Sequence, residues 1–271
     1  MSEWLVNARM YAVTPGVETL WCELLTRIAA DAGVSVAYLP YPAPQPLEVL
    51  WRRRDLAAVF MCGFPIALKL ASVVPIAAPV PRAPWAQGKG VYRTDLIVRR
   101  DSRFQTLEDT FGGRAGFTVA HSHSGFNAFR HHLLGFRTAT RPALYRTMAE
   151  NLVTARKVLE SVRDGSIDVG PLDAYWHLLL AHHAPHLVAD IRVLTSTATA
   201  PMPAFVASTA APAHRVSQLR AAFESAKSQP WFEKLAEPLL IQDFAAVDEA
   251  AYSVLLDWDR DAKAAGYDQP A

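Results

Sequence analysis

Two observations predict an α/β protein built of two lobes. Through the first hundred residues, apolar strand patterns alternate with amphipathic helical patterns, an order that forms a sheet with helices on both faces. A second alternating block follows, bounded by strand-like crossings at 90–99 and 201–207. The first block is predicted to hold strands at 8–13, 34–39 and 56–61 and helices at 17–32, 47–53 and 66–71. The second is predicted to hold strands at 115–120, 166–170 and 191–194 and helices at 129–134, 149–163 and 174–183.

The two crossings define the expected domains. Lobe 1 is expected to comprise residues 1–96 and 199–271, and lobe 2 is the inserted segment 97–198. The helical tail that begins at Arg215 is expected to pack on lobe 1. Each lobe is then a mixed sheet flanked by helices. A cleft between two lobes is a favoured place for a small-molecule site.

Composition narrows the function classes. The 271 residues are 51% hydrophobic and 20% charged, with a net charge of +1, which is ordinary for a globular protein and gives no electrostatic case for nucleic acid or a membrane surface. No stretch has the pattern of a signal peptide or a membrane span, so we expect either a cytosolic protein or a chain whose signal has been removed. Prolines cluster between 40 and 84, which favours linkers and turns there.

The most informative motif is the hydroxyl-rich segment 121–127, with the sequence His-Ser-His-Ser-Gly-Phe-Asn. It lies between an apolar strand pattern and an amphipathic helix. A helix start presents unpaired backbone N–H groups and the positive end of the helix dipole, and therefore attracts anions. The alternative is that Ser122 or Ser124 merely caps the helix. Both interpretations stay open from the local sequence.

Short motifs along most of the chain, about 8–255, resemble one known family. They are the segments 11–13, 55–60 with Gly63, 92–98, 106–109 with 112–114, the Ser122-x-Ser124-Gly125 loop, and 165–170 with Asp173. The chain resembles the phosphate, phosphite and phosphonate substrate-binding proteins of ABC transporters, which have the type 2 periplasmic binding protein fold. The resemblance implies a solute-binding protein that closes on a small anionic ligand, a transporter permease as partner, and a periplasmic location.

The resemblance also implies a set of ligand-binding residues. The oxyanion would contact Ser122, Ser124 and Gly125, while Asp173 would receive the ammonium group of an aminophosphonate. From the other lobe, Tyr11, Cys62 and Gly63 would close the site. This sequence departs from the family in the histidines at 121 and 123, in Cys62, and in the missing signal peptide.

The residues themselves add to that expectation. Many neutral donors can share the charge of an oxyanion, so no buried cation is required. A protonated His121 or His123 would add charge and make binding depend on pH. Aromatic side chains can line such a cleft. The full predicted ligand-binding set is Tyr11, Cys62, Gly63, Phe64, Tyr92, Ser122, His123, Ser124, Gly125 and Asp173.

An enzyme of the same fold is the alternative. Cys62 at a strand end, opposite His121, would be a nucleophile with a general base, as in the cofactor-precursor or thiaminase-like proteins that share this fold. No motif supplies an orienting acid. The histidines at 177, 182, 183 and 186 lack metal-ligand spacing, so we expect no metal and no cofactor.

Overall fold

The computed structural model describes residues 3–271, and the chain divides into two compact units. Unit 1 is the chain up to Tyr92 together with Pro201–Ser253, and unit 2 is Arg93–Ala200 together with Val254–Ala271. The chain therefore passes between the units three times, at 92/93, 200/201 and 253/254. The third passage differs from the prediction, which assigned all of residues 199–271 to lobe 1.

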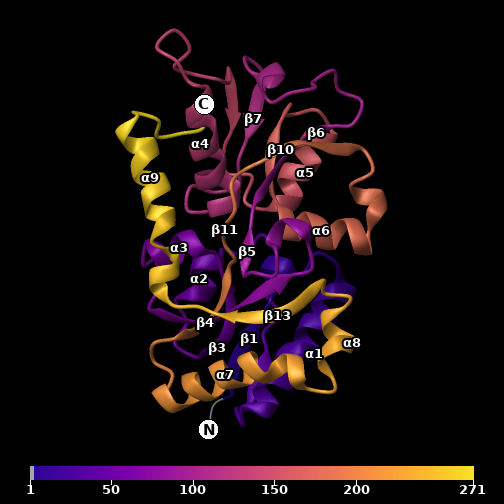
Figure 1. Ribbon diagram of the computed structural model, residues 1–271, viewed down its shortest axis with the longest axis vertical. Coiled ribbons are helices and arrows are strands. Elements are labelled where there is room, and N and C mark those ends of the chain that lie inside the picture. The colour runs from indigo at the N-terminus through magenta and orange to yellow at the C-terminus, as the bar shows by residue number, and fades with distance from the viewer. Residues whose placement is uncertain (1–2) are drawn as a thin grey trace. The chain divides into compact units, whose positions relative to one another are not determined.

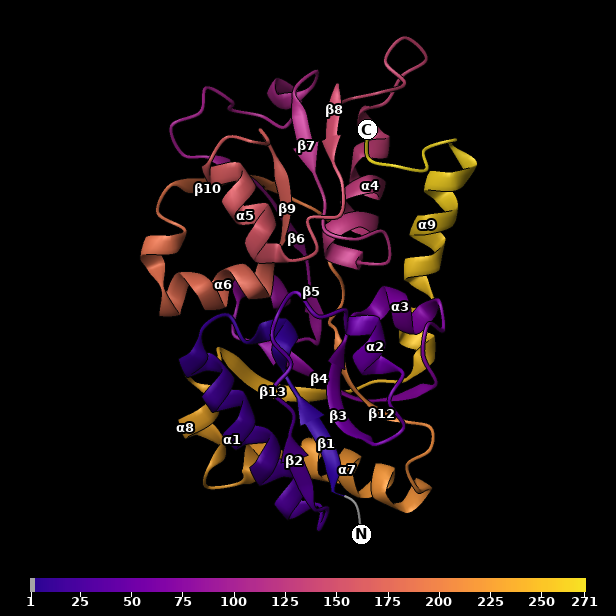
Figure 2. The same cartoon turned by 180° about the vertical axis from the view of Figure 1, so that it is seen from behind.

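Unit 1 is built on a mixed six-stranded sheet of order β13-β4-β12-β3-β1-β2 (Figure 1). β1 pairs in parallel with β2 and β3, while β12 and β13 run antiparallel to β4. Its strands are β1 Trp4–Asn7, β2 Val36–Tyr38, β3 Leu56–Met61, β4 Val73–Pro81, β12 Ala204–Ser208 and β13 Ile241–Ala246. Its helices are α1 Pro15–Asp31, α2 Leu47–Trp51, α3 Gly63–Ala67, α7 Ala213–Ser225 and α8 Phe232–Ala236. α1 packs beside α7 and α8, whereas α2 contacts β3 (Figure 2).

Local sequence explains the first crossover of unit 1. Thr14 caps α1 by accepting a hydrogen bond from the Val17 amide at 3.2 Å, and Pro15 occupies the first helical position. The stripe that includes Trp21 faces the sheet, where its ring meets Phe60 of β3 edge-on at 5.2 Å. Every residue of β3 is buried, as expected for a strand covered on both faces.

The first strand lies earlier in the chain than predicted. β1 ends at Asn7, and Arg9–Tyr11 forms a 3-10 helix in place of the strand expected at 8–13. Asn7 causes this, because its side-chain oxygen accepts the Arg9 amide at 2.9 Å and its nitrogen donates to the Leu39 carbonyl at 2.8 Å. An asparagine bonded in this way to the backbone two residues later turns the chain.

Within the proline-rich stretch 40–84, residues 73–81 form a strand, not a linker, whereas residues 40–46 are irregular as expected. β4 is paired on both sides, with Pro75 opposite Val206 and Pro81 opposite Ile241. Both prolines lie where the register with the neighbouring strand shifts. A proline lacks the amide that a regular ladder requires, so irregularities of this kind accommodate it within the sheet.

Unit 2 contains a three-stranded antiparallel sheet of order β10-β6-β9 and a parallel pair, β7 and β8. The strands are β6 Thr94–Arg99, β7 Arg114–Gly116, β8 Thr147–Ala149, β9 Gly170–Asp173 and β10 Ile191–Ser196. The helices are α4 Ala128–Leu133, α5 Ala155–Arg163, α6 Ala174–His183 and α9 Val254–Ala264, with a π-helical turn at His123–Asn127. Where the chain passes between the units, β5 Val91–Tyr92 and β11 Ala200–Pro201 form a two-stranded pair. The remaining 3-10 helices are Pro84–Ala86, Glu108–Thr110, Leu134–Phe136, Pro185–Leu187, Ala226–Ser228 and Glu249–Tyr252.

A buried guanidinium holds the C-terminal helix on unit 2. Arg130 of α4 is 2% exposed and donates to the Asp259 carboxylate of α9 and to the Asp268 carbonyl. Tyr267 from the same tail belongs to the apolar core of this unit. These contacts, made by residues about 130 positions apart, explain why the tail groups with unit 2.

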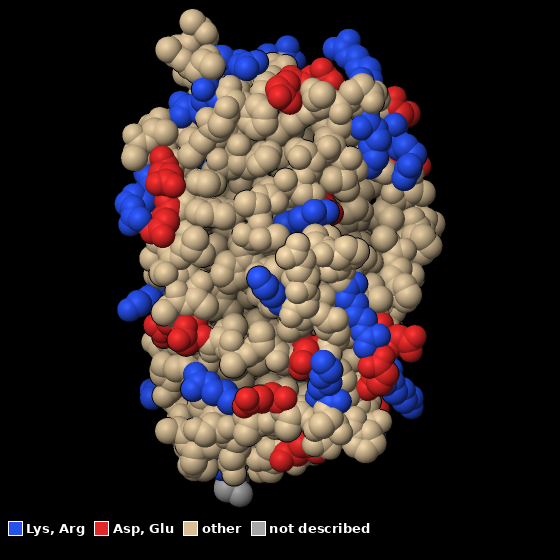
Figure 3. Space-filling model, viewed as in Figure 1, with Lys and Arg blue, Asp and Glu red and all other residues tan. Residues whose placement is uncertain are grey.

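Charges elsewhere are mostly exposed and mixed in sign. On the face in Figure 3, lysine and arginine side chains are interspersed with aspartate and glutamate. Exposed pairs such as Arg53–Asp55 contribute little to stability, about 0–1 kcal/mol. The Arg130–Asp259 pair differs from these exposed pairs because its guanidinium is buried.

We predict that Asp259→Ala lowers the free energy of unfolding by about 3–5 kcal/mol, because it leaves the charge of Arg130 buried without its carboxylate. Asp257→Ala, on the same helix, breaks the exposed pair with Arg260 and is expected to cost less than about 1 kcal/mol. Urea unfolding followed by circular dichroism measures both. Equal losses for the two variants would contradict this account of Arg130.

Candidate functional site

Three loops of unit 2 leave the same edge of its parallel strands. β7 pairs in parallel with β8, and Ala115 of β7 forms a parallel bridge to Val169, the residue before β9. The carboxyl ends of these strands therefore coincide. The loop at 117–127 follows β7, residues 150–154 follow β8, and Asp173 ends β9. Ligands of α/β sheets bind outside the carboxyl ends of parallel strands.

Ser122 caps the helical segment that follows β7. Its side-chain oxygen accepts the Gly125 amide at 3.1 Å, and its carbonyl accepts the Asn127 amide at 3.0 Å. The capping interpretation of the sequence is therefore correct. In this cap the Ser122 hydroxyl only accepts a hydrogen bond, so it can still donate its own proton to another group. The bond across five residues makes the first turn π-helical, and this wider turn leaves one more amide without an intrahelical acceptor than an α-turn does.

Gly125 is required by a close approach from Thr118. A Cβ atom at position 125 would lie 1.9 Å from the Thr118 hydroxyl oxygen. The Thr118 amide also donates to the Gly125 carbonyl at 3.3 Å. Ser124 is fixed on its other side, because its carbonyl accepts the Thr94 hydroxyl of β6 at 3.2 Å. The loop is thus held by Thr118 from within the loop and by Thr94 of β6, and neither residue was identified from the sequence as part of the site.

The His123 side chain is buried and packs within unit 2. It is 1% exposed, its ring lies 5.1 Å from that of Trp258 on α9, and its Nδ1 lies 3.4 Å from the Asn127 side-chain nitrogen. Burial, with a smaller effect of the neighbouring His131, lowers the pKa of His123 to about 3. The imidazole is therefore neutral near pH 7, which corrects the expectation that a protonated His123 adds positive charge to the loop. His121 is half-buried.

Asp173 caps α6. One carboxylate oxygen accepts the amides of Tyr175 at 2.9 Å and Trp176 at 3.0 Å, and the residue is 8% exposed. It pairs with Thr94 across β9 and β6, so it belongs to the same group of strand ends as the serine loop. Its predicted contact with an ammonium group stays a prediction.

The other predicted ligand-binding residues belong to unit 1. Tyr11 is buried and packs edge-on against Phe60, with ring centroids 4.9 Å apart. Cys62 immediately precedes α3, whose first residues are Gly63 and Phe64, and Tyr92 ends β5. All five predicted residues of this unit are buried: Tyr11, Cys62, Gly63, Phe64 and Tyr92. Burial, with a smaller effect of Cys62, raises the pKa of the nearby Tyr252. It stays a prediction that these residues share a ligand with unit 2. It also stays a prediction that Cys62 acts together with His121.

Sequence reasoning missed a polar cluster on the other face of β6. The Asp95 carboxylate accepts the Ser196 hydroxyl at 2.7 Å and lies 2.9 Å from Nδ1 of His177. Arg93 lies 3.6 Å from the same carboxylate. Successive side chains of a strand point to opposite faces, so the sequence alone could have placed Asp95 on the face of this strand opposite Thr94. Within residues 3–271, no group of three or more histidine, cysteine or acidic side chains is arranged to hold a metal ion.

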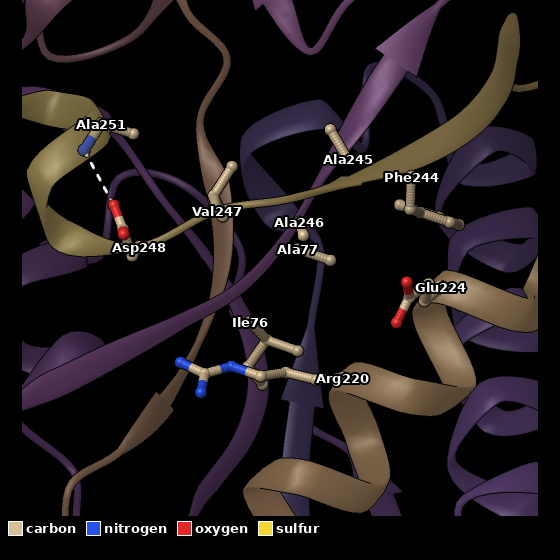
Figure 4. Close-up of a pocket in the computed structure, with 10 residues that line it drawn as sticks. All are labelled: Ile76, Ala77, Arg220, Glu224, Phe244, Ala245, Ala246, Val247, Asp248 and Ala251. Carbon is tan, nitrogen blue, oxygen red and sulfur yellow. Dashed lines mark hydrogen bonds between the residues drawn. The ribbon is translucent and has the colours of Figure 1, made fainter.

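Unit 1 contains a separate open pocket of about 430 Å³ (Figure 4). It lies between α7, which contributes Arg220 and Glu224, and the end of β13. Arg220 donates to the Pro75 carbonyl at 2.7 Å, and Asp248 caps the following 3-10 helix through the Ala251 amide. None of the predicted ligand-binding residues lines this pocket.

Solved structures with the same fold are numerous. A binding protein component of an ABC phosphonate transporter from Pseudomonas aeruginosa superposes with a TM-score of 0.80 at 15% identity, over 98% of this chain and 88% of that one. A Prochlorococcus marinus protein in complex with methylphosphonate gives 0.76 at 14% identity, over 96% and 98%. A Xanthomonas citri protein bound to ATP gives 0.66 at 18% identity, over 98% of both chains. The fold is thus the two-lobed, mixed α/β fold of periplasmic binding proteins, as predicted.

The family follows from the sequence itself. The model of the family described as ABC transporter, phosphonate, periplasmic substrate-binding protein matches residues 14–252. The chain belongs to this family of solute-binding proteins, which confirms the resemblance. No curated protein matches it significantly. Among residues 3–271, no helix has both the length and the apolar character needed to cross a membrane.

We predict that Gly125→Ala destabilises unit 2 by about 1–3 kcal/mol, because the added methyl group collides with Thr118. Gly135→Ala is the control, since a Cβ there meets nothing within 4 Å. Thermal unfolding measures both. Replacing Thr118 by glycine in the Gly125→Ala background should recover part of the loss, and an absence of recovery would contradict the contact.

We predict that His123 makes the protein less stable in acid. Its folded-state pKa lies below the unfolded value, so the unfolded chain binds more protons between about pH 6.5 and pH 3. The contribution is complete above about pH 6.5 and falls by about 1.4 kcal/mol per pH unit as the pH is lowered through that window. His123→Gln should flatten the pH dependence of the unfolding free energy. An unchanged slope would show that other groups titrate there.

Proposed function

We propose that this protein binds a phosphonate or a related small oxyanion at the loop Ser122–Gly125 of unit 2 and delivers it to an ABC transporter. The carrying observation is the position of this loop, at the carboxyl ends of three parallel-aligned strands and at the start of a helix. Membership of the family supports the same assignment.

The chemistry of the loop suits an anion. Amide groups of the first helical turn and the hydroxyls of Ser122 and Ser124 are donors, and the helix dipole adds partial positive charge. A micromolar dissociation constant corresponds to about 8 kcal/mol. One neutral hydrogen bond contributes about 0.5–1.5 kcal/mol, so several of these donors must act together.

The relatives define the ligand classes to be compared. One structural neighbour was solved with methylphosphonate, and others with ATP or chloride. Tyr11, Cys62, Gly63, Phe64 and Tyr92 are proposed to complete the site from unit 1, and Asp173 to receive a cationic substituent where the ligand carries one. A permease partner and a periplasmic location are part of the same proposal.

We expect Ser122→Ala combined with Ser124→Ala to weaken methylphosphonate binding by about ten- to a hundredfold, since two hydroxyl donors are lost. Isothermal titration calorimetry of both proteins measures this, with inorganic phosphate and chloride as comparison ligands. Ser102→Ala is the matched control, because its hydroxyl is bonded to the Arg99 carbonyl in an exposed turn. Unchanged affinity in the double variant would remove the serine loop from the site.

A further inference from the structure

The turn that follows β8 contains a strained and exposed valine. Val153 has a φ of +67°, in the left-handed region that β-branched residues avoid. Asn151, two residues earlier, also has a positive φ of +55°, which asparagine tolerates. The Val153 side chain is 44% exposed, so burial does not compensate for the strain.

Specific hydrogen bonds hold this turn against the chain that leads into the serine loop. The Leu152 amide donates to the Phe117 carbonyl at 3.1 Å, and the Val153 amide donates to the Thr118 carbonyl at 3.2 Å. Thr118 is the residue whose hydroxyl lies against Gly125. Val153 is therefore linked through Thr118 to Gly125 of the serine loop, which carries the proposed oxyanion donors.

The two sides of the turn have different roles. The Leu152 side chain faces inward, where a Cβ atom on Gly116 would lie 3.0 Å from it. Thr154 caps α5 by accepting the Lys157 amide at 3.1 Å. Both neighbours are thus anchored, and between them Val153 presents an exposed apolar side chain at the carboxyl edge of β7, β8 and β9.

Strained residues of this kind concentrate at ligand-binding sites, where the surrounding structure enforces the conformation. We propose that Val153 contacts the organic substituent of the ligand and so selects a phosphonate with a short apolar group over inorganic phosphate. This inference rests on the proposed function, because it needs the oxyanion to bind at Ser122–Gly125. The serine loop then binds the oxygens that both ligands share, and Val153 distinguishes them by the group in which they differ.

The test compares the affinities for methylphosphonate and inorganic phosphate in one titration series. Val153→Thr keeps the β-branched shape and the backbone strain but replaces a methyl group by a hydroxyl. It should lower the preference for methylphosphonate over phosphate by about three- to tenfold, the range expected for the loss of one apolar contact. Val153→Gly removes the strain, should raise the melting temperature, and should lower the same preference. Val193→Thr, at an exposed valine of β10, should leave the preference unchanged.

The outcomes separate the two proposals. If wild type binds both ligands and neither Val153 variant changes their ratio, the role of Val153 is overturned while the proposed function stands. Equal weakening for both ligands also overturns it, because it indicates a structural effect on the loop. If wild type binds neither ligand, the proposed function fails and this inference fails with it.

Discussion

Unit 2 depends on the burial of one charge, the guanidinium of Arg130. A buried cation is tolerated only where its partners are placed around it, and here they come from distant parts of the chain. Asp259 and the Asp268 carbonyl belong to the C-terminal tail, while the Asn127 side chain belongs to the first turn after the serine loop. The guanidinium also lies 4.8 Å above the ring of Phe126. Burial acts to raise the pKa of Asp259, but hydrogen bonds from Lys263 and Arg130 outweigh it, so that pKa lies below its usual range. A shift of the start of α4 would uncover this charge, so the contacts of Arg130 also fix the position of the turn that follows the serine loop.

The sequence predicts those parts of the fold that depend on local patterns. Apolar periodicity located α1, β3 and α6 well, because each is long or uniformly buried. It placed the first strand too late, because the chain turns where the Asn7 side chain accepts the Arg9 amide, and apolar periodicity does not mark that position. The same side chain also donates to the Leu39 carbonyl, 32 residues away. The proline content also predicted a linker where the structure has β4. Proline content argues against a central strand, and the register shifts of the neighbouring strands show how Pro75 and Pro81 are accommodated.

The candidate site likewise contains residues that local sequence identifies and residues that it does not. Ser122 and Gly125 could be identified because hydroxyl and glycine residues between a strand and a helix are a local signal. Thr118 could not, because its importance arises from an approach to Gly125 across the loop. His123 was predicted as a ligand-binding residue since the motif alone does not tell which way its side chain points. The position of Trp258, more than a hundred residues later, decides that it is buried and neutral.

Parallel pairing places the Arg114–Asp168 ion pair at the opposite ends of the strands from the groups available to a ligand. Arg114 begins β7 and binds Asp168 just before β9, so this ion pair lies at the amino ends of the strands. At the carboxyl ends, three helical segments begin, capped by Ser122, Thr154 and Asp173. Each helix start favours negative charge, but the carboxylate of Asp173 already supplies it at α6. The caps Ser122 and Thr154 are neutral and leave their helix starts available to an anion, and the segment at Ser122 adds the hydroxyls of two serines and a wider first turn. The negative charge of Asp173 at the same edge favours a ligand whose other end is neutral or cationic, such as the organic substituent of the proposed phosphonate.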